Sequence, residues 1–257
     1  GKVELFYNPQ RCIGCNICVE ICKQKAIHSE VYSEKRIDRI LCTCCSLCAK
    51  ACPSMALSTK GKPMTVKEVI DIVLRDKPFY NSKGGVTFSG GEPFMQPEFF
   101  LELLKYAKQH GLNTAVETSG CAAWCHIQSA MPYLDMIIYD FKHPDSETHR
   151  KITGVGNELI YDNLAKLVAQ GINLLVRIPL IPGFNSNEVT LRKSAAILKG
   201  IGVRTIEFLY YHTLGESKCA FLGRNYGYLP DDDGKEERAK LAVGIFGGMG
   251  IEVILDA

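Results

Sequence analysis

The chain has 257 residues, with 30 Lys and Arg against 28 Asp and Glu, and a formal net charge of +2. This balance gives no reason to expect a nucleic-acid partner or an anionic membrane surface as the ligand. We also find no run of about eighteen apolar residues that could cross a bilayer.

The first sixty residues are dominated by cysteine. We predict a lead-in segment at 1–10, with a short strand at 2–7, and a cysteine-rich domain at 11–60. Two runs with the spacing Cys-x2-Cys-x2-Cys-x3-Cys lie in this domain, namely Cys12, Cys15, Cys18 and Cys22, and Cys42, Cys45, Cys48 and Cys52. A disulfide framework suits a small secreted domain, and zinc prefers two Cys-x-x-Cys pairs to two matched runs of four. The spacing is instead that of bacterial two-cluster ferredoxins.

In that ferredoxin pattern the fourth cysteine of each run ligates the other cluster. We therefore predict one 4Fe–4S cluster on Cys12, Cys15, Cys18 and Cys52, and a second on Cys22, Cys42, Cys45 and Cys48. Two features depart from the pattern, since Lys23 follows Cys22 where proline is expected and Cys44 adds a thiol beside Cys45. Cysteines held for iron indicate a reducing, anaerobic cytoplasm.

After a linker at 60–63, the segment 61–257 alternates between strand and helix patterns. The predicted strands are 85–88, 113–117, 134–139, 173–178, 204–209 and 251–255. The predicted helices are 65–75, 97–110, 122–131, 157–170, 187–199 and 235–247. This alternation is typical of β/α units with a parallel sheet, either a partial barrel or a doubly wound sheet.

Polar residues close five consecutive predicted strands. They are Gly90-Gly91-Glu92, Glu117-Thr118, Asp140 with Lys142, Arg177, and His212. Ligands of β/α folds bind at the carboxyl ends of the strands, and two adjacent glycines let the backbone approach a ligand closely. We therefore predict one shared site at this rim. A structural alternative stays open for each residue: Arg177 pairing with a strand carboxylate, Lys142 on the surface, His212 in the core.

Together with the cysteine runs, these motifs resemble the radical S-adenosylmethionine (SAM) superfamily. Within it, the match is to the activating enzymes of glycyl radical enzymes, the pyruvate formate-lyase activase group with an inserted two-cluster ferredoxin domain. The resemblance rests on Gly-Gly-Glu-Pro at 90–93, Asp-Phe-Lys at 140–142, and the stretches 149–154, 176–185 and 211–218. It implies an α/β fold, a partial (β/α)6 radical SAM barrel lacking its first strand, beside the small ferredoxin-like domain.

The same resemblance implies a set of SAM-binding residues. They are Gly90, Gly91, Glu92, Pro93, Glu117, Asp140, Phe141, Lys142, Arg177 and His212. Glu117, Thr118 and Asp140 resemble a site for a monovalent cation beside the SAM carboxylate. His149 is more plausibly structural than catalytic, and no acid or base catalyst is assignable.

The implied reaction is reductive cleavage of SAM to methionine and a 5′-deoxyadenosyl radical. That radical abstracts hydrogen from a glycine of a partner enzyme, while a donor such as flavodoxin or ferredoxin supplies electrons through the clusters. A third 4Fe–4S cluster, on a Cys-x3-Cys-x2-Cys loop, binds SAM in this family.

No such loop occurs in the sequence, so we expect the chain to be a fragment of a longer protein. Cys121 and Cys125 share one of the required gaps but lack a third partner, and we interpret them as incidental; Cys219 reads as a core thiol. Two alternatives remain. One is an iron–sulfur electron-transfer protein without radical chemistry, and the other is a different ferredoxin-containing radical SAM maturase.

Overall fold

A computed structural model describes residues 3–31, 36–81, 84–212, 215–224 and 234–255 of the chain. It divides into two compact units, one made of Gly1–Pro63 with His212–Pro230 and the other of Met64–Tyr211 with Asp231–Ala257. This division differs from the predicted ranges at two places. The segment 1–10 is part of the first unit rather than a separate lead-in, and 212–230 groups with the first unit rather than with the barrel.

The first unit contains a two-stranded antiparallel sheet and two short helices. Strand β1 (Glu4–Tyr7) pairs with β2 (Leu57–Lys60), with Tyr7 opposite Leu57. The helices are α1 (Ile17–Ile21) and α2 (Leu47–Ala51), which pack against each other. A single 3-10 turn at Pro9–Arg11 and α9 (Gly215–Phe221) complete the elements of this unit.

The first unit is an internal repeat. Adding 30 to the number of each cysteine in the first run gives the second run, and the same shift relates α1 to α2. The shift also takes Ile27 to Leu57 and Tyr7 to Ile37. The isolated antiparallel bridge between Ile27 and Ile37 therefore corresponds to the pairing of Leu57 with Tyr7. The buried core of this repeat is small and includes two of the cysteines: Leu5, Tyr7, Cys18, Ile27, Ile37, Cys48, Ala56 and Leu57.

The second unit is built on a six-stranded parallel sheet in the order β3-β4-β5-β6-β7-β8, so every strand lies beside its sequence neighbour. The strands are β3 (Gly85–Phe88), β4 (Asn113–Thr118), β5 (Met136–Asp140), β6 (Leu174–Leu180), β7 (Thr205–Tyr210) and β8 (Glu252–Leu255). The predicted partial barrel of β/α units on a parallel sheet is confirmed, and all six predicted strands are present.

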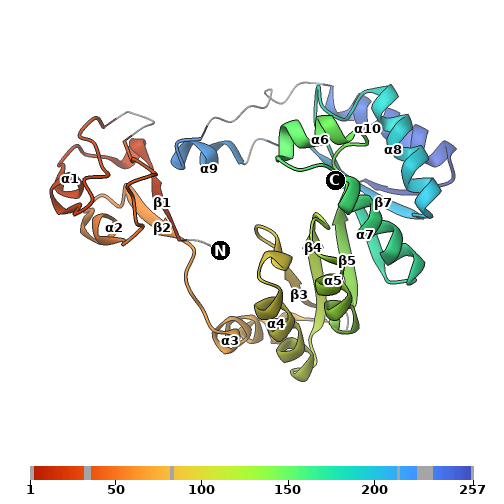
Figure 1. Cartoon of the computed structure of the whole chain (residues 1–257), viewed down its shortest axis with the longest axis horizontal. Coiled ribbons are helices and arrows are strands. Elements are labelled where there is room, and N and C mark those ends of the chain that lie inside the picture. Colours follow the sequence, from red (N-terminus) through yellow and green to blue (C-terminus); the bar gives the residue numbers. More distant parts are fainter. Residues whose placement is uncertain (1–2, 32–35, 82–83, 213–214, 225–233, 256–257) are drawn as a thin grey trace. The chain divides into compact units, whose positions relative to one another are not determined.

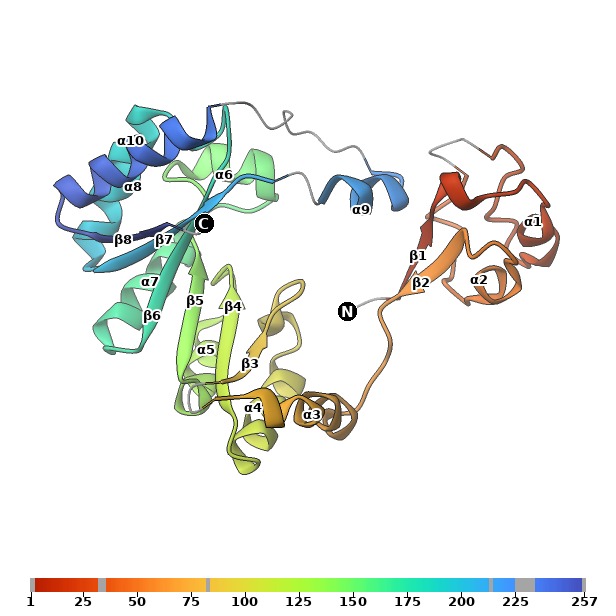
Figure 2. The same ribbon diagram turned by 180° about the vertical axis from the view of Figure 1, so that it is seen from behind.

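Helices cover one face of this curved sheet, as Figures 1 and 2 show. They are α3 (Val66–Arg75), α4 (Pro97–Gln109), α5 (Trp124–Ala130), α7 (Glu158–Ala169), α8 (Glu188–Ile201) and α10 (Lys235–Gly248), with α6 (Ser146–Thr153) after β5. Single 3-10 turns lie at Lys77–Phe79, Pro93–Met95 and Met131–Tyr133. At the start of α3, Thr65 and Glu68 form a reciprocal capping box, which fixes that helix end.

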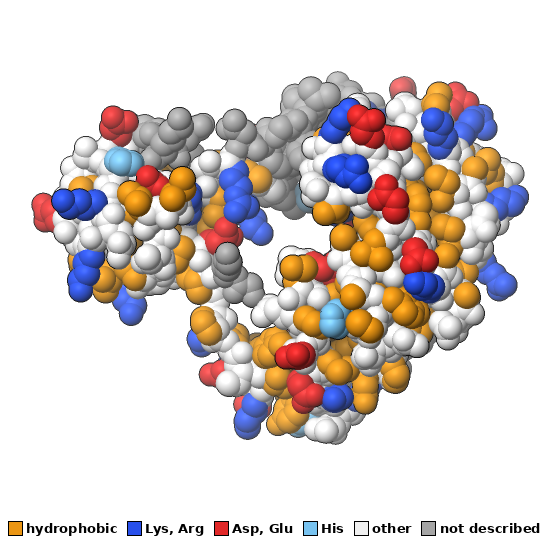
Figure 3. All heavy atoms as spheres, in the orientation of Figure 1, with side chains coloured by type: hydrophobic (Ala, Val, Ile, Leu, Met, Phe, Trp, Pro, Cys, Tyr) orange, Lys and Arg blue, Asp and Glu red, His pale blue; other side chains and the backbone are white. Residues whose placement is uncertain are grey.

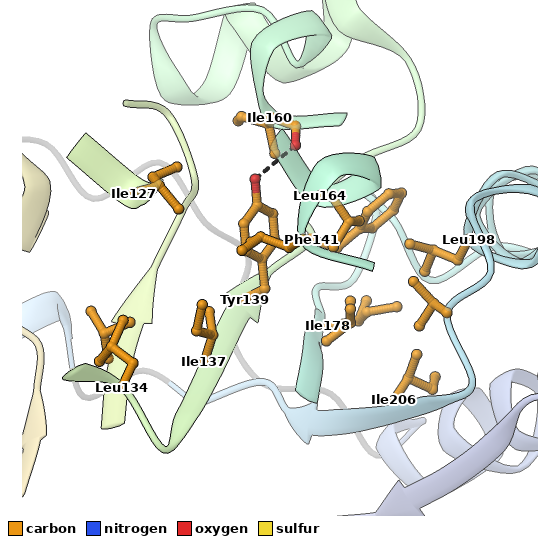
Figure 4. Packing of buried hydrophobic residues seen from close by; sticks show 14 of the residues in the cluster. Ile127, Leu134, Ile137, Tyr139, Phe141, Ile160, Leu164, Ile178, Leu198 and Ile206 are labelled. Carbon is orange, nitrogen blue, oxygen red and sulfur yellow. Dashed lines mark hydrogen bonds between the residues drawn. The ribbon is translucent and has the colours of Figure 1, made fainter. Parts of the chain in front are cut away.

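The two faces of the sheet differ in chemistry because successive side chains point to opposite sides. On the helix-covered face lie buried side chains such as Val116, Tyr139, Val176 and Phe208. Figure 4 shows this packing around Tyr139, whose hydroxyl donates to the carbonyl oxygen of Ile160 over 2.7 Å. The opposite face carries the charged residues of the strands, which makes it the face where a site can form.

Three features of the structure were not predicted. Helix α6 was missed, and β6 was predicted to end before Pro179 but continues to Leu180. The strand tolerates the proline because its pairing with β5 ends at Arg177 and only β7 continues alongside it. Helix α9 in the first unit was also missed.

Acidic and basic side chains are intermixed on the described part of the face that Figure 3 shows, in line with the near-balanced composition. Among the described residues, no helix is both long and apolar enough to cross a membrane.

Candidate functional site

The first unit encloses two hollows, each lined by four cysteines of the predicted sets. The first hollow is lined by Cys12, Cys15, Cys18 and Cys52. The second is lined by Cys22, Cys42, Cys45 and Cys48, with Cys44 added. Each hollow therefore takes three cysteines from one run and the last cysteine from the other run.

This arrangement suits a four-iron cluster better than a single ion. Among the described residues, no three His, Cys, Asp or Glu side chains converge on one point where a single metal ion would fit. A 4Fe–4S cluster binds each thiolate to a different iron, so its ligands surround a volume rather than a point. The donor set of each hollow, four sulfurs around a space, fits such a cluster.

The thiols of the two hollows differ in acidity. Burial raises the pKa of Cys48 to about 11 and also raises the pKa of Cys42. Burial acts in the same direction at Cys52, but hydrogen bonds from the backbone at Leu57 and from the Ser54 hydroxyl outweigh it and lower the pKa of that thiol. Since iron binds the thiolate form, loading the second hollow must displace protons from its buried cysteines.

In the second unit, the loop after β3 places Gly90 and Gly91 at the sheet rim. Both have positive φ, +84° and +72°, and a Cβ at either position would meet no heavy atom within 4 Å. Glycine is therefore required by the backbone conformation rather than by crowding. The open space beside both residues leaves their backbone accessible to a ligand.

Glu92 joins the ends of two neighbouring strands. Its carboxylate accepts hydrogen bonds from the Thr118 hydroxyl at 2.7 Å, from the Ser119 amide at 2.8 Å and from the Ser119 hydroxyl at 2.7 Å. The Phe94 amide donates a further bond at 3.3 Å. The sequence suggested that Glu92 offers an acceptor to a cationic ligand, but in this structure its oxygens fix the β3 loop to the end of β4.

The loop after β4 is held rigidly as well. Asn163 on α7 is fully buried and donates to the carbonyl oxygens of Gly120 and Ala122, both at 2.8 Å. A Cβ at Gly120 would lie 1.7 Å from the Tyr139 hydroxyl, so only glycine fits this close approach. The rim that carries Gly90 and Gly91 therefore rests on a loop with little freedom to move.

A row of charges runs across the open face of the sheet. Arg177 donates through Nη1 to Glu117 and through Nε to Glu207, each over 2.6 Å. Arg177 therefore pairs with strand carboxylates, as the structural alternative expected. Asp140 is the register partner of Arg177 and pairs with Lys142 at 3.6 Å. Glu117, Asp140, Arg177 and Glu207 lie on the neighbouring strands β4 to β7, which explains why they meet.

The surroundings of Asp140 disfavour its charged form. Burial raises the pKa of its carboxyl, Glu117 adds to the rise, and Lys142 and Arg177 oppose it. A carboxylate held in such surroundings is stabilised by a cationic ligand, which is the kind of group that the sulfonium and amine of SAM present.

The structure does not bring every predicted residue into this set. Phe141 is buried at 1% exposure and stacks on Tyr161 with ring centroids 5.4 Å apart, so its side chain belongs to the core. The Thr118 side chain lies on the helix-covered face and is bonded to Glu92, so its hydroxyl does not join Glu117 and Asp140 in a cation site. His212 is exposed and groups with the first unit, so the structure does not join it to this row.

The remaining predicted residues have modest roles. Pro93 opens a 3-10 turn after Glu92. His149 is buried and bonded to the Val155 carbonyl and the Thr153 hydroxyl, which is a structural role. Cys121 is half-buried and packs against the core, Cys125 is exposed on α5, and Cys219 is half-buried on α9. All described cysteines are free thiols.

Two residues of these sites were not identified from the sequence. Glu207 is a charged residue inside the otherwise apolar strand β7, which is a signal that could have been used. Arg36 lines the first hollow and is buried at 1% exposure. Nothing in its local sequence distinguishes it from a surface arginine.

Comparison with known proteins places this geometry in a family. A model of the radical SAM superfamily matches residues 39–194, and a model of a 4Fe-4S binding domain matches residues 5–28. Together they imply that the chain uses SAM and iron–sulfur clusters.

Curated relatives agree with these matches. The isethionate sulfite-lyase activating enzyme of Nitratidesulfovibrio vulgaris is 47% identical over 87% of this chain and 75% of its own length. The choline trimethylamine-lyase activating enzyme of Oleidesulfovibrio alaskensis is 38% identical over 88% of this chain and 75% of its own length.

A solved structure supports the fold. A domain of the pyruvate-formate lyase-activating enzyme from Bacteroides vulgatus has a TM-score of 0.57 and 28% identity, and the match covers 68% of this chain and 99% of that domain. The chain therefore belongs to the radical SAM superfamily and, within it, to the activating enzymes of glycyl radical enzymes.

Proposed function

We propose that this chain forms a glycyl radical in a lyase of the isethionate sulfite-lyase class. The activity type follows from the family, and the observation that carries the choice of partner is the sequence identity. It is 47% to an activating enzyme of an isethionate sulfite-lyase, against 38% to one of a choline trimethylamine-lyase.

In this proposal the first unit holds two 4Fe–4S clusters. Cys12, Cys15, Cys18 and Cys52 bind one, and Cys22, Cys42, Cys45 and Cys48 bind the other, as the linings of the two hollows support. Bound clusters supply one-electron transfer from an external donor such as a flavodoxin or ferredoxin. Cys44 lies beside this second set as a non-ligand thiol.

The second unit holds SAM at the sheet rim. The backbone of Gly90 and Gly91 lies open for the methionine amino group, while Glu92 keeps that loop attached to β4. Asp140, with its raised pKa, offers a carboxylate to a cationic group, and Lys142 and Arg177 offer donors to the SAM carboxylate. A monovalent cation beside Glu117 and Asp140, and a contact from His212, belong to this proposal as secondary elements.

The test has two stages. Calorimetric titration of SAM into the reconstituted full-length protein should give binding that Gly91→Ala and Asp140→Asn weaken at least tenfold, with Glu188→Gln on the exposed side of α8 as the control. The same full-length protein is then mixed anaerobically with SAM, reductant and a lyase. We expect a glycyl radical signal and sulfite release with isethionate sulfite-lyase, and a far weaker signal with choline trimethylamine-lyase. SAM affinity that is equal in all variants would refute the binding site, and a reversed partner preference would refute the assigned lyase.

A further inference from the structure

Arg36 is a buried arginine at the wall of the first hollow. Its side chain is 1% exposed and lines the space surrounded by Cys12, Cys15, Cys18 and Cys52. Nη2 donates to the sulfur of Cys18 over 3.6 Å. Among all the described basic side chains, it is the one that lines this hollow.

The other contacts of Arg36 hold it in place but do not neutralise it. Nη1 donates to the carbonyl oxygen of Ser29 at 3.0 Å, Nη2 also donates to the Asn16 amide oxygen at 3.4 Å, and the guanidinium lies 5.3 Å from the centre of the Tyr7 ring. Within the described ranges no carboxylate forms an ion pair with it, and its Nε has no partner.

Burial of an unpaired cation is costly, so a compensating negative charge is expected close by. The four thiolates of a loaded hollow supply that charge, since iron binds cysteine in its deprotonated form. Among the described neighbours no carboxylate supplies the charge that compensates Arg36, whereas a cluster in the first hollow would supply it.

Among the described residues, the second hollow has no buried charge equivalent to Arg36, since Arg39, whose charge acts on Cys42, is exposed. The 30-residue repeat makes Phe6 the counterpart of Arg36, and Phe6 is buried and apolar. The basic residue lining the second hollow is Lys23, which is exposed. Water screens an exposed charge far more than a buried one.

The exposure of the cysteines does not differ between the hollows. Each has one exposed cysteine, Cys15 or Cys45, and one buried cysteine, Cys18 or Cys48, at equivalent positions. A second difference adds to Arg36, because the Ser54 hydroxyl lies 3.6 Å from the sulfur of Cys52 in the first hollow. Its counterpart in the repeat is Gln24.

We propose that Arg36 raises the reduction potential of the first cluster above that of the second. The inference rests on the proposed function, which assigns the eight cysteines to two clusters. Reduction adds one electron from an external one-electron donor to a cluster, the donor is oxidised by one electron, and no bond breaks. A nearby buried cation and hydrogen bonds to the sulfurs stabilise the added negative charge. At equilibrium, an electron that enters the first unit therefore occupies the first cluster in preference to the second.

The test is a redox titration of the full reconstituted protein, monitored by electron paramagnetic resonance. Arg36→Met should lower the potential of one cluster so that its reduction equilibrium falls at least tenfold, which is about 59 mV for one electron. The other cluster should not change. Cys15→Ser, which alters one ligand of the first cluster, identifies which signal belongs to it.

Arg11→Met is the matched control. It removes the same charge one residue before Cys12, but Arg11 is exposed, so both potentials should stay within error. The proposal is overturned if Arg36→Met leaves the first cluster unchanged or shifts both clusters equally. If Arg36→Met fails to load iron, Arg36→Gln decides by the same two criteria. Far fewer than eight irons per wild-type chain would instead refute the cluster assignment of the proposed function.

Discussion

Glu92 offers the sharpest test of how the loop after β3 is held. The substitution Glu92→Gln keeps the shape of the side chain but replaces one oxygen with an NH2 group, which cannot accept a hydrogen bond. This NH2 group would replace one of the two carboxylate oxygens of Glu92. Whichever oxygen it replaces, the hydrogen bonds to that oxygen are lost, including either the one from the Ser119 amide at 2.8 Å or the one from the Thr118 hydroxyl at 2.7 Å.

The magnitude follows from the contacts that are lost. A hydrogen bond to a charged group contributes about 1.5 to 3 kcal/mol, and hydroxyl donors can rotate to recover part of the loss whereas the Ser119 amide cannot. We expect Glu92→Gln to lower the free energy of unfolding of the second unit by about 2 kcal/mol. With a urea dependence of roughly 2 kcal/mol per molar, the midpoint of unfolding falls by about 1 M.

The assay uses the only tryptophan of the chain, Trp124, which begins α5 in the second unit. Its fluorescence during urea unfolding reports on this unit and not on the cysteine-rich one. Glu188→Gln is the control, because its ion pair with Arg192 joins two side chains that are both more than half exposed and should matter by less than about 0.5 kcal/mol. A midpoint for Glu92→Gln that matches the control would refute the role of Glu92 as a strand connector.

Four further predictions concern other parts of the molecule. Removing iron with a chelator should make residues 4–60 sensitive to protease while the fluorescence of Trp124 stays native. The reason is that the buried core of the first unit is small and includes Cys18 and Cys48. Equal resistance to protease with and without iron would contradict this prediction. Gly120→Ala should lower the stability of the second unit by about 3 kcal/mol or more, measured by the same urea assay, because its Cβ would overlap the Tyr139 hydroxyl. Arg177→Met should lower the free energy of unfolding of the second unit by about 2 to 3 kcal/mol, because Glu117 and Glu207 lose the cation that they share. A loss below about 0.5 kcal/mol would show that water already screens the charges of these three residues. Finally, burial raises the pKa of the Asp140 carboxyl above its ordinary 3.8. The folded state therefore binds the carboxyl proton more tightly than the unfolded state does, and the free energy of unfolding falls as the pH rises from 3.8 to the raised pKa. Asp140→Asn should gain stability relative to the wild type over this pH range, and a stability difference that does not change with pH would contradict the assignment.

The order of strands and helices in the barrel could be predicted from the sequence because their patterns are strong. Apolar residues recur at helical spacing between Thr65 and Arg75, and Gly111 and Gly171 follow helices as expected of helix ends. Helix α6 was missed because its eight residues contain mostly polar side chains, and only His149 among them is buried. A local pattern cannot reveal a helix that has almost no apolar face.

The candidate site was predictable in part for a similar reason. Position at the end of a strand identified Glu117, Asp140 and Arg177, but it could not say on which face a side chain points. Thr118 follows Glu117 directly, and the alternation of the strand sends it to the covered face. The two sets of cysteines that line the hollows could be predicted because a fixed spacing defines them, whereas Arg36 depended on the three-dimensional fold of the repeat.

The exchange of the last cysteine between the two hollows has a consequence for synthesis. Cys52 lies in the first hollow and Cys22 in the second. Neither half of the repeat therefore contains all four cysteines that line one hollow. While the ribosome is still adding residues before Cys52, the nascent chain offers only three thiols around its earliest pocket. Assembly of the proposed clusters therefore requires both halves of the repeat, and deleting either half should prevent formation of a four-cysteine cluster in the other.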